Sequence, residues 1–460
     1  MKVLGDLRQI LGERGVLDTQ TLSERAAGIW RQDERLKGLA LARPDSTEGV
    51  AQTLAYCNRH GIPVVTQGGL TGLVHGADTD HEAVILSLER LDKIEALSPN
   101  QRTLTVQAGV KLETVQQAAG GEGLIFPLDL GARGSATVGG NAATNAGGNR
   151  VIRYGMMRDM VLGVEAVLAD GTIINALNGL IKNNTGYDLK QLFLGSEGTL
   201  GIITRLTLRL FEAPLTRNMA FAAVDSFDGV KGLLRHMDKN MGGSLSAFEA
   251  LWSNYYQLVT SPPSKNRPPV PQGHAFYVLM ESQGADSQSD SIRFQSALER
   301  AHDQGLIADA AIAQSESECQ AFWHIRDDVE QVFVGGHSFL FDVSLPIDAM
   351  ETYVQAVTNR LEHTPAQHFW VFGHLGDGNL HLAIQIPATT DRDCQTEIES
   401  CVYEPLVSCK GSVSAEHGIG LEKKRWLPVS RSPAEIQLMK TIKTALDPKS
   451  ILNPGKILDF

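Results

Sequence analysis

The sequence predicts an α+β fold with two domains. Its 460 residues exceed the size at which a single hydrophobic core keeps growing, so two domains are expected. Strand-like and helix-like segments are mixed along the chain. The strands expected at 160–169 and 172–176 are joined by Asp170-Gly171, a strong hairpin signal. Hairpins among mixed elements favour an α+β arrangement over a doubly wound parallel sheet.

The elements of the first half follow from hydrophobic periodicity. Residues 1–36 have the spacing of amphipathic helices, and residues 48–60 have the spacing of a further helix. A short apolar strand is expected at 62–66. Residues 103–110 alternate as a half-buried strand does, and residues 111–119 then predict a helix.

A domain seam is expected near residues 211–214. Beyond it, the proline-rich segment 262–271 predicts a stiff connector, and a lid near the active site is the alternative interpretation. A strand is expected at 276–281 and a helix at 289–301. Further strand and helix segments continue to about residue 410, and the sequence contains no internal repeat.

Composition narrows the range of partners and locations. The net charge of −12 argues against nucleic acid or anionic lipid as the main partner, because both reward clustered Lys and Arg. The N-terminal segment is charged from Lys2 and has no apolar core, so no secretory signal is expected. No stretch is long and apolar enough to predict a membrane-spanning helix. The 5 cysteines form no C-x-x-C pair, which indicates reduced thiols in a cytoplasmic protein.

Three glycine-rich loops, at 67–72, 134–149 and 195–204, lie in the first half. None is a G-x-G-x-x-G fingerprint or a P-loop. Each mixes glycine with hydroxyl and amide side chains, and successive backbone N–H groups of small residues suit a pyrophosphate. Tight turns explain any one loop equally well. Three together predict a large phosphate-bearing cofactor.

These loops carry a family resemblance. The patterns are Gln-Gly-Gly-x-Thr-Gly at 67–72, Gly-Gly-Asn-x-x-Thr-Asn-Ala-Gly-Gly at 139–148, Lys-Asn-Asn-Thr-Gly-Tyr-Asp-Leu at 182–189 and Gly-Ser-Glu-Gly-Thr-Leu-Gly at 195–201. They resemble the FAD domain of the vanillyl-alcohol oxidase superfamily, in the branch of D-lactate and D-2-hydroxyglutarate dehydrogenases. The resemblance implies a two-part FAD-binding domain with an α+β substrate cap domain. The expected ranges are 1–212 for the FAD-binding domain, 213–420 for the cap carrying a metal site, and 421–460 for a C-terminal segment that returns to the FAD domain.

The resemblance also implies which residues contact FAD. They are Gln67, Gly68, Gly69, Leu70, Thr71, Gly72, Ser135, Thr137, Gly140, Asn141, Asn145, Gly147, Gly148, Gly198, Ile203 and Asn453. Family members that bind flavin covalently usually place His directly after the Gly-Gly pair, where this chain has Leu70. His75 lies five residues later and is out of pattern, so non-covalent FAD is expected.

Two histidines predict a metal site. His374 and His381 flank Asp377-Gly378, between apolar strands expected at 369–372 and 382–386. Residues opposite each other in a hairpin point to the same side, so both imidazoles can converge on one ion. A third ligand is expected from the Glu-His-Gly-Ile-Gly run that begins at Glu416. Two histidines and a carboxylate with an open position form a catalytic zinc pattern, and the same ligands accept Mn²⁺ or Co²⁺. The alternative is that these histidines are ordinary polar side chains at the end of a hairpin, with their hydrogen bonds satisfied within the protein.

The resemblance assigns roles to these residues. Carried over by position, His374, His381 and Glu416 bind the metal and His417 is the general base. A metal lowers the pKa of a bound hydroxyl, so that a neutral His can take its proton near pH 7, and a hydride then passes to the flavin. Trp-x-x-Arg at 323–326 implies that Arg326 holds the substrate carboxylate with two parallel bonds.

The identity of the acid follows from three further positions. Relatives that oxidise D-2-hydroxyglutarate hold its distal carboxylate with Thr, Lys and Asn, and the corresponding residues here are Glu330, Leu340 and Ala383. No cation is left for a distal carboxylate, and burying an unpaired charge is costly. We therefore expect a D-2-hydroxy acid with an uncharged or hydrophobic side chain, with D-2-hydroxyglutarate or D-lactate as alternatives.

Two other functions share parts of this pattern. A flavin subunit of a glycolate oxidase-type complex shares the His motif, but the run Asp342-Val343-Ser344-Leu345-Pro346 favours the stand-alone dehydrogenase branch. A flavin-binding sensor is disfavoured because base, metal ligands and carboxylate-binding Arg occur together. The electron acceptor is expected to be an electron-transfer flavoprotein, a quinone or a cytochrome. The sequence leaves the oligomeric state open, with a homodimer as one option.

Overall fold

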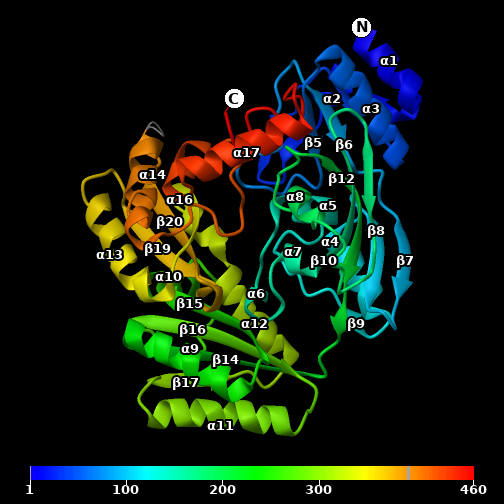
Figure 1. Ribbon diagram of the computed structural model, residues 1–460. Coiled ribbons are helices and arrows are strands. Elements are labelled where there is room, and N and C mark those ends of the chain that lie inside the picture. Colours follow the sequence, from blue (N-terminus) through cyan, green and yellow to red (C-terminus); the bar gives the residue numbers. More distant parts are fainter. Residues whose placement is uncertain (1, 391–393, 460) are drawn as a thin grey trace. The chain divides into compact units, whose positions relative to one another are not determined.

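The chain divides into two compact units in this computed structural model, which describes residues 2–390 and 394–459 (Figure 1). Unit 1 comprises Met1–Gly148, Gly155–Ala213 and Glu416–Phe460, and unit 2 comprises Asn149–Tyr154 and Pro214–Ala415. Both units mix helices with largely antiparallel sheets. The α+β class predicted from the sequence is confirmed.

Unit 1 contains the following elements. Its helices are α1 (Lys2–Leu11), α2 (Thr19–Leu22), α3 (Thr47–His60), α4 (Leu112–Gly120), α5 (Val138–Thr144), α7 (Met157–Met160), α8 (Lys190–Phe193), α16 (Leu427–Ser430) and α17 (Pro433–Leu446), with 3-10 turns η1 (Glu13–Gly15) and η6 (Lys424–Trp426). Its strands are β1 (Val16–Leu17), β2 (Ala26–Gly28), β3 (Arg31–Arg35), β4 (Ala40–Ala42), β5 (Val64–Gln67), β6 (Val84–Ser87), β7 (Ile94–Ser98), β8 (Thr103–Gln107), β9 (Leu124–Ile125), β10 (Val161–Val167), β11 (Ile173–Ala176), β12 (Ile202–Arg209) and β13 (Phe211–Glu212).

Two main sheets build unit 1. One has the order β1-β4-β6-β5, in which β4, β6 and β5 run parallel, and the other is antiparallel with the order β11-β10-β12-β8-β7. Apolar residues of both sheets and of α3 and α4 form one core. The C-terminal segment joins the edge of the first sheet, where the Val64 N–H donates to the Ile451 carbonyl at 2.7 Å and the Asn453 N–H donates to the Val64 carbonyl at 2.8 Å. The last residues of the chain therefore lie beside the loop that begins at Gln67.

The helix expected at 48–60 is α3, because Ser46 accepts from the Gly49 N–H at its start and Gly61 adopts a φ of 64° at its end. The expected 160–176 hairpin is β10–β11, with Val167 opposite Ile173. The expectation of helices throughout 1–36 is wrong at β1 and again beyond α2. Residues 26–35 form the β2–β3 hairpin, since the Ile29 N–H donates to the Leu70 carbonyl at 3.1 Å and tertiary pairing overrides the helical spacing.

Unit 2 contains the following elements. Its helices are α6 (Val151–Tyr154), α9 (Phe227–Met241), α10 (Ser253–Thr260), α11 (Ser289–Asp303), α12 (Glu316–Asp327), α13 (Met350–Leu361), α14 (Gln395–Tyr403) and α15 (Leu406–Cys409), with 3-10 turns η2 (Val329–Phe333), η3 (Ile347–Ala349) and η4 (Leu375–Asp377). Its strands are β14 (Thr216–Val224), β15 (Leu245–Trp252), β16 (Phe276–Gly284), β17 (Asp309–Ile312), β18 (Gly336–Ser344), β19 (His368–Gly373) and β20 (Asn379–Pro387).

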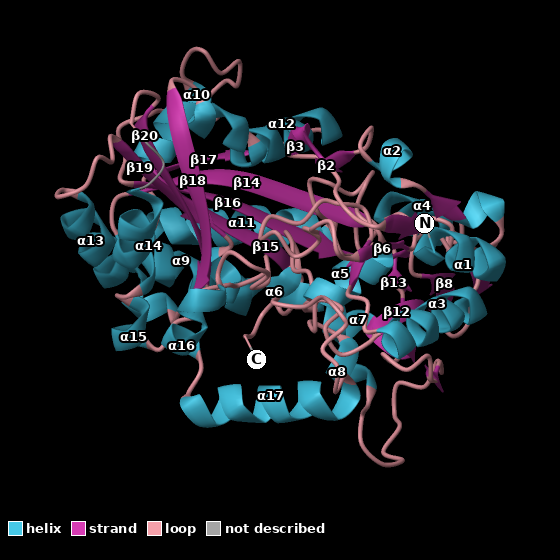
Figure 2. Ribbon diagram, turned by 90° about the horizontal axis from the view of Figure 1, so that it is seen from above, coloured by secondary structure: helices cyan, strands magenta, loops and turns pink. Residues whose placement is uncertain are grey.

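A seven-stranded antiparallel sheet of order β17-β14-β16-β15-β19-β20-β18 is the centre of unit 2. Figure 2 shows α10 and α12 on one face of this sheet and α9 and α11 on the other. The face below α10 and α12 carries a core of aromatic side chains that includes Tyr255, Phe322, Trp323 and Phe372. The expected strand at 276–281 and the expected helix at 289–301 lie within β16 and α11.

The proline-rich segment 262–271 connects α10 to β16 and is fastened to its surroundings. Ser264 Oγ donates to the Val259 carbonyl at 2.9 Å and to Asp328 Oδ2 at 3.0 Å, and Asn266 Nδ2 contacts the same two residues. These bonds hold the segment against the end of α12, in keeping with the interpretation of a stiff connector.

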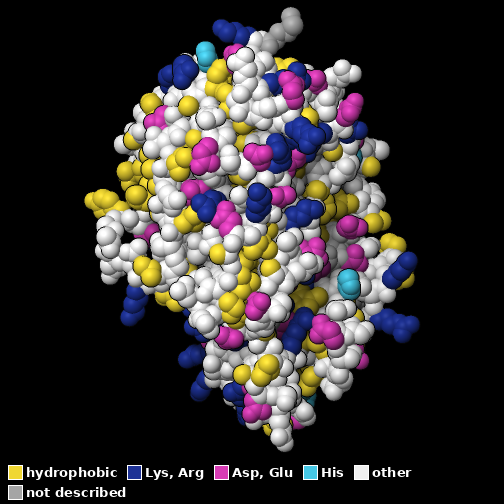
Figure 3. Space-filling model, turned by 90° about the vertical axis from the view of Figure 1, so that its right-hand side faces the viewer, with side chains coloured by type: hydrophobic (Ala, Val, Ile, Leu, Met, Phe, Trp, Pro, Cys, Tyr) yellow, Lys and Arg dark blue, Asp and Glu magenta, His cyan; other side chains and the backbone are white. Residues whose placement is uncertain are grey.

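Acidic and basic side chains are interspersed over the face drawn in Figure 3, with no continuous basic patch there. None of the helices in the described part of the chain combines the length and the apolar run that a bilayer crossing needs. The cysteines at 57, 319, 394, 401 and 409 are all free thiols, and burial raises the pKa of the Cys57 thiol to about 12. A thiol with so high a pKa is unreactive at neutral pH.

Candidate active site

A cavity of about 570 Å³ lies within unit 1 and is lined mainly by the glycine loops. Its size is that of a cofactor or drug-sized ligand site. Twelve of the sixteen residues expected to contact FAD line this cavity: Gly68, Gly69, Leu70, Thr71, Gly72, Thr137, Gly140, Asn141, Gly147, Gly198, Ile203 and Asn453. The structure thus brings together three loops that are separated by up to 140 residues in the sequence and adds the C-terminal segment to them.

Four expected residues do not line the cavity. The Gln67 side chain turns away and donates to the Ala77 carbonyl at 3.1 Å. The Asn145 side chain accepts from the Arg158 N–H in the first turn of α7 at 2.9 Å. Ser135 and Gly148 act through packing instead. A Cβ atom on Gly69 would lie 2.0 Å from the Ser135 carbonyl oxygen, and Gly148 adopts a φ of 133°.

Two buried polar atoms of the cavity wall fit a cofactor. Within the described residues, Thr66 Oγ1 and Asn141 Oδ1 are shielded from solvent and have no hydrogen-bond partner. Orphaned polar atoms are rare in folded proteins and call for a ligand or water. A Cβ atom on Gly68 would lie 2.5 Å from Thr137 Oγ1, so only glycine lets these loops approach so closely. The wall therefore has the close-packed backbone and free polar groups that a dinucleotide requires.

Backbone strain concentrates at the same cavity. Four of the nine non-glycine residues with positive φ in the described chain line it, namely Leu70, His75, Glu197 and Asn453. Asparagine tolerates this region, whereas leucine and glutamate pay a steric penalty there. Such outliers persist where the surroundings fix them and cluster at functional sites.

Glu197 connects the third glycine loop to the Glu-His-Gly-Ile-Gly run. Its carboxylate accepts from the Ile419 N–H at 2.7 Å and from the Gly420 N–H at 2.8 Å. Burial raises the pKa of Glu197, and these two hydrogen bonds oppose that effect. The turn that follows His417 is thereby fixed against a loop of the cavity. Glu416 and His417 both line the cavity.

In unit 2, the antiparallel pairing of β18 with β20 positions four further site residues. Asp342 pairs with His381, and Leu340 pairs with Ala383 two residues away along each strand. Residues paired across a ladder, and residues two apart on one strand, share a face of the sheet. All four side chains therefore lie on one face, in two adjacent rows.

Asp342 is fully buried and anchors the segment that leads to Glu416. Its carboxylate accepts from Asn379 Nδ2 at 2.9 Å, from Ser414 Oγ at 3.2 Å and from the Ala415 N–H at 3.0 Å. Ser412 adds an isolated bridge to Ser344. Ala415 is the last residue of unit 2, so chain continuity alone places Glu416 close to Asp342.

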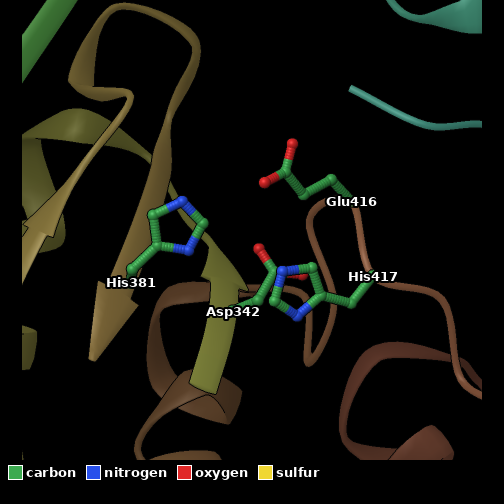
Figure 4. A group of neighbouring side chains, drawn as sticks. All are labelled: Asp342, His381, Glu416 and His417. Carbon is green, nitrogen blue, oxygen red and sulfur yellow. The ribbon is translucent and has the colours of Figure 1, made fainter. Parts of the chain in front are cut away.

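A group of four candidate metal ligands lies at this point of the chain. The ligand atoms of Asp342, His381, Glu416 and His417 lie within 4.8 Å of one another, and Figure 4 shows the four side chains turned toward a common centre. Two imidazoles and two carboxylates are a donor set that Zn²⁺, Mn²⁺ and Co²⁺ accept. The residues present thus fit a divalent metal.

His374 lies outside this group of four. The predicted hairpin is β19–β20, but its register places Phe372 opposite His381, because η4 and Gly378 extend the connection. The expected direct pairing of the two histidines is therefore wrong, although their ring centroids are 5.2 Å apart. His374 Nδ1 lies 2.7 Å from Glu249 Oε1.

Arg326 is buried on the last turn of α12. Its Nε donates to Glu249 Oε2 at 2.8 Å, its Nη1 donates to Asp327 Oδ1 at 3.2 Å, and its Nη2 lies 3.0 Å from His374 Nε2. The guanidinium also lies 5.5 Å from the centre of the Phe372 ring, within cation–π range. Glu330 is exposed on η2 and contributes no buried charge.

Three acidic residues of this region were missed in the sequence analysis as members of the site. Asp342 was noted only as part of a branch marker, and Glu197 only as part of a glycine loop. Glu249 carried a signal: it is the single charged residue of β15, Leu-Ser-Ala-Phe-Glu-Ala-Leu-Trp. A carboxylate inside a fully buried strand needs specific partners.

Glycine loops along a cofactor-sized cavity, with a histidine on its wall, suit an oxidoreductase that binds a dinucleotide cofactor. Residues 39–177 match the FAD binding domain family, and residues 213–457 match the C-terminal domain of FAD linked oxidases. The chain belongs to the family of FAD-linked oxidases. The expectations of FAD as cofactor and of an FAD-dependent dehydrogenase are confirmed.

Several curated relatives cover nearly the whole chain. The mitochondrial D-2-hydroxyglutarate dehydrogenase of Arabidopsis thaliana is 39% identical over 98% of this chain and 80% of its own length. The corresponding protein of Bos taurus is 40% identical over 99% of this chain and 83% of its own length. A putative mitochondrial D-lactate dehydrogenase of Schizosaccharomyces pombe is 38% identical over 93% of this chain and 83% of its own length.

Solved structures share the fold. p-Cresol methylhydroxylase matches with a TM-score of 0.76 over 100% of this chain and 96% of its own, at 16% identity. The 4-ethylphenol oxidase of Gulosibacter chungangensis matches with a TM-score of 0.76 over 99% of this chain and 96% of its own, at 18% identity. The predicted fold of the vanillyl-alcohol oxidase type is confirmed.

The expected cytoplasmic location is contradicted by the relatives. Those from Arabidopsis thaliana, Bos taurus and Schizosaccharomyces pombe are all named as mitochondrial proteins. The lack of an apolar secretory core does not distinguish these locations, because a mitochondrial address is an amphipathic, Arg-rich segment without such a core. Reduced thiols do not distinguish between the two locations either.

Proposed function

We propose that this chain oxidises a D-2-hydroxy acid with an uncharged or hydrophobic side chain to the 2-oxo acid. FAD and a divalent metal assist, with His374, His381 and Glu416 as metal ligands and His417 as the general base. The observation that carries the substrate class is the apolar row of side chains beside His381 on the sheet of unit 2.

That row consists of Trp370, Ala383 and Leu340, which are neighbours across β19, β20 and β18. It lies one step along the sheet from the row that contains His381. Trp370 and Ala383 are buried in the same core, and the partly buried Leu340 packs against it. A substrate whose hydroxyl is held near His381 would extend its side chain over an apolar wall, on which a carboxylate would lose hydration without gaining a partner.

The reaction removes two electrons and two protons from the alcohol. The substrate hydroxyl gives its proton to the imidazole of His417, the hydrogen on the same carbon leaves as a hydride, and a carbonyl bond forms between that carbon and oxygen. When bound, FAD supplies the two-electron acceptor and a divalent metal supplies acidification of the hydroxyl. General-base assistance of this kind contributes roughly 10²- to 10⁴-fold in rate.

The residues of the cavity support non-covalent FAD. Leu70 offers no nucleophile after the Gly-Gly pair. His75 lines the cavity, but its Nδ1 lies 2.9 Å from Asp78 Oδ2 and 3.2 Å from Arg31 Nη1. Denaturing the protein with acid should therefore release all of the flavin into the supernatant. Flavin that stays with the precipitated protein would contradict this part of the proposal.

The relatives favour a second candidate, D-2-hydroxyglutarate. Two of the three similar proteins described above are named for that diacid. In this chain, the row next to His381 presents no basic side chain, which is why we place the monocarboxylic acids first.

The test is anaerobic reduction of the flavin by a panel of D- and L-2-hydroxy acids, before and after treatment with a chelator. We expect bleaching by D-acids with aliphatic or aromatic side chains, loss of bleaching with EDTA, and recovery with Zn²⁺. Preferential bleaching by D-2-hydroxyglutarate would refute the substrate class and leave the chemistry intact. Bleaching that is indifferent to the chelator would refute the metal.

A further inference from the structure

Glu249 is a charged residue at the centre of a buried strand. It lies midway along β15, with only 1% of its surface exposed, on the sheet face covered by α10 and α12. Each carboxylate oxygen has its own partner: Oε2 accepts from Arg326 Nε at 2.8 Å, and Oε1 lies 2.7 Å from His374 Nδ1. One carboxylate therefore bridges the residue expected to hold the substrate carboxylate and a residue expected to bind the metal.

The fold fixes this bridge from two sides. The β15–β19 register pairs Ala250 with Gly373, which brings Glu249 next to His374 at the end of β19. On the opposite side, the Tyr255 hydroxyl on α10 donates to the Arg326 carbonyl at 3.1 Å and holds the end of α12 in place. The bridge is thus assembled by a strand register and by helix packing rather than by a loop.

The partners of His374 fix its tautomer. Arg326 can only donate hydrogen bonds, so His374 Nε2, which lies 3.0 Å from Arg326 Nη2, must be the acceptor. An ionised carboxylate accepts hydrogen bonds and cannot donate them. His374 Nδ1 must therefore carry the proton, which leaves the lone pair of a neutral imidazole on Nε2. This is the tautomer that a histidine needs in order to bind a metal through Nε2.

We propose that Glu249 is a positioning residue that orients both His374 and Arg326, and so couples metal affinity to substrate affinity. The proposal rests on the proposed function, which makes His374 a ligand and Arg326 the carboxylate-binding group. A carboxylate on the far nitrogen of a metal-binding histidine fixes its tautomer and ring orientation, and its loss typically weakens metal affinity 10- to 100-fold.

The second half of the coupling follows from the Nε2 atom of His374. This atom lies 3.0 Å from Arg326 Nη2 and has one lone pair, so it can accept from Arg326 or bind a metal, but not both. Metal binding at Nε2 therefore leaves Nη2 of Arg326 for the substrate carboxylate, while Glu249 keeps its hold on Nε. Metal and acid are expected to bind with positive cooperativity.

The variant Glu249→Gln tests the proposal, and Glu281→Gln is its matched control. Glu281 lies on the neighbouring strand β16, is equally buried, and accepts from Arg150 Nε at 3.1 Å and Arg217 Nε at 2.7 Å, but it contacts neither His374 nor Arg326. Both variants remove one buried charge that is paired with arginine. A general loss of stability should therefore affect the two alike.

The measurements are Zn²⁺ affinity of the flavin-loaded protein, by competition with a chromophoric chelator, and KM and kcat for the best D-2-hydroxy acid. We expect Glu249→Gln to weaken Zn²⁺ binding 10- to 100-fold and to raise KM by at least tenfold, whereas Glu281→Gln changes both by less than threefold. Equal effects in the two variants would overturn the positioning role.

Two further variants keep the outcome decisive. If Glu249→Gln does not retain flavin, Glu249→Asp preserves the charge and is too short to reach both partners. It should then lose either Zn²⁺ affinity or substrate affinity, and a variant that keeps both would refute the coupling. The variant His374→Ala distinguishes the assignment of His374 as a metal ligand from the positioning role of Glu249. Unchanged Zn²⁺ affinity in His374→Ala refutes the metal assignment itself, whereas loss there with no effect in Glu249→Gln refutes only the role of Glu249.

Discussion

Replacing Leu340 by lysine should move the substrate preference toward a diacid. Leu340 pairs with Ala383, one row along the sheet from Asp342 and His381. Since an antiparallel strand advances about 3.4 Å per residue, the two rows lie about 7 Å apart, within reach of a lysine side chain and the far end of a five-carbon acid. The partly buried position keeps the ammonium group accessible to water while its stem covers the apolar wall.

The expected size of the effect follows from two opposing contributions. An ion pair at about 4 Å in an environment of effective dielectric constant 20 gains roughly 4 kcal/mol. Ordering the lysine side chain costs roughly 2 kcal/mol, which leaves about 2 kcal/mol. Because about 1.4 kcal/mol corresponds to a factor of ten, the ratio of kcat/KM for D-2-hydroxyglutarate to that for an aliphatic D-2-hydroxy acid should rise roughly thirty-fold.

The assay is steady-state turnover with an artificial electron acceptor, measured for both acids in Leu340→Lys and in the neutral control Leu340→Met. The control preserves volume and apolar character, so its ratio should stay within about threefold of the original. An unchanged ratio in Leu340→Lys, in a protein that still binds flavin, would refute the placement of the substrate side chain along this row.

Three further predictions concern strain, acid stability and the metal. Leu70→Asn should raise the free energy of unfolding by about 1 kcal/mol, because the φ of 55° penalises leucine more than asparagine; a lower urea midpoint would contradict this. Burial raises the pKa of Glu281, but Arg150 and Arg217 outweigh it and lower the value from 4.5 to about 2. The stabilisation is therefore present above pH 4.5 and lost as the pH falls toward 2. It amounts to about 3 kcal/mol. In Glu281→Gln, the free energy of unfolding should therefore depend less on pH between 4.5 and 2. The same pH dependence as in the original protein would contradict the ion pairing. Glu416→Gln should lose zinc in metal analysis and keep its flavin absorbance; full zinc occupancy would remove Glu416 from the ligand set.

Much of the fold could be predicted from local signals. The helix at 47–60 has a serine cap and a terminal glycine, and the 160–176 hairpin has Asp-Gly at its turn, so both elements are encoded within a few residues. The segment 26–35 could not be predicted in this way. It forms a hairpin through a hydrogen bond to Leu70, some forty residues away, and no local pattern reports such a contact.

The site residues also fall into a group that local motifs predict and a group that only long-range pairing brings together. The glycine loops, the segment from His374 to His381 and the Glu-His-Gly-Ile-Gly run are each contiguous in the sequence, and they predicted most of the cavity wall and His381, Glu416 and His417. Glu249 is more than 70 residues from either of its partners, and only the register of β15 with β19 brings it to His374. Long-range strand pairing is the information that a single sequence does not display.

The segment Asn149–Tyr154 has a consequence for dissecting the protein. It precedes the rest of unit 2 by some sixty residues, yet Arg150 bonds to the buried Glu281 and the Tyr154 hydroxyl donates to Gln283 Oε1 at 2.9 Å. A fragment cut as one contiguous piece, Pro214–Ala415, would lack both partners and leave Glu281 with a single arginine. Exchanging unit 2 between related enzymes therefore requires two inserted segments. Asn149–Tyr154 must be replaced together with Pro214–Ala415.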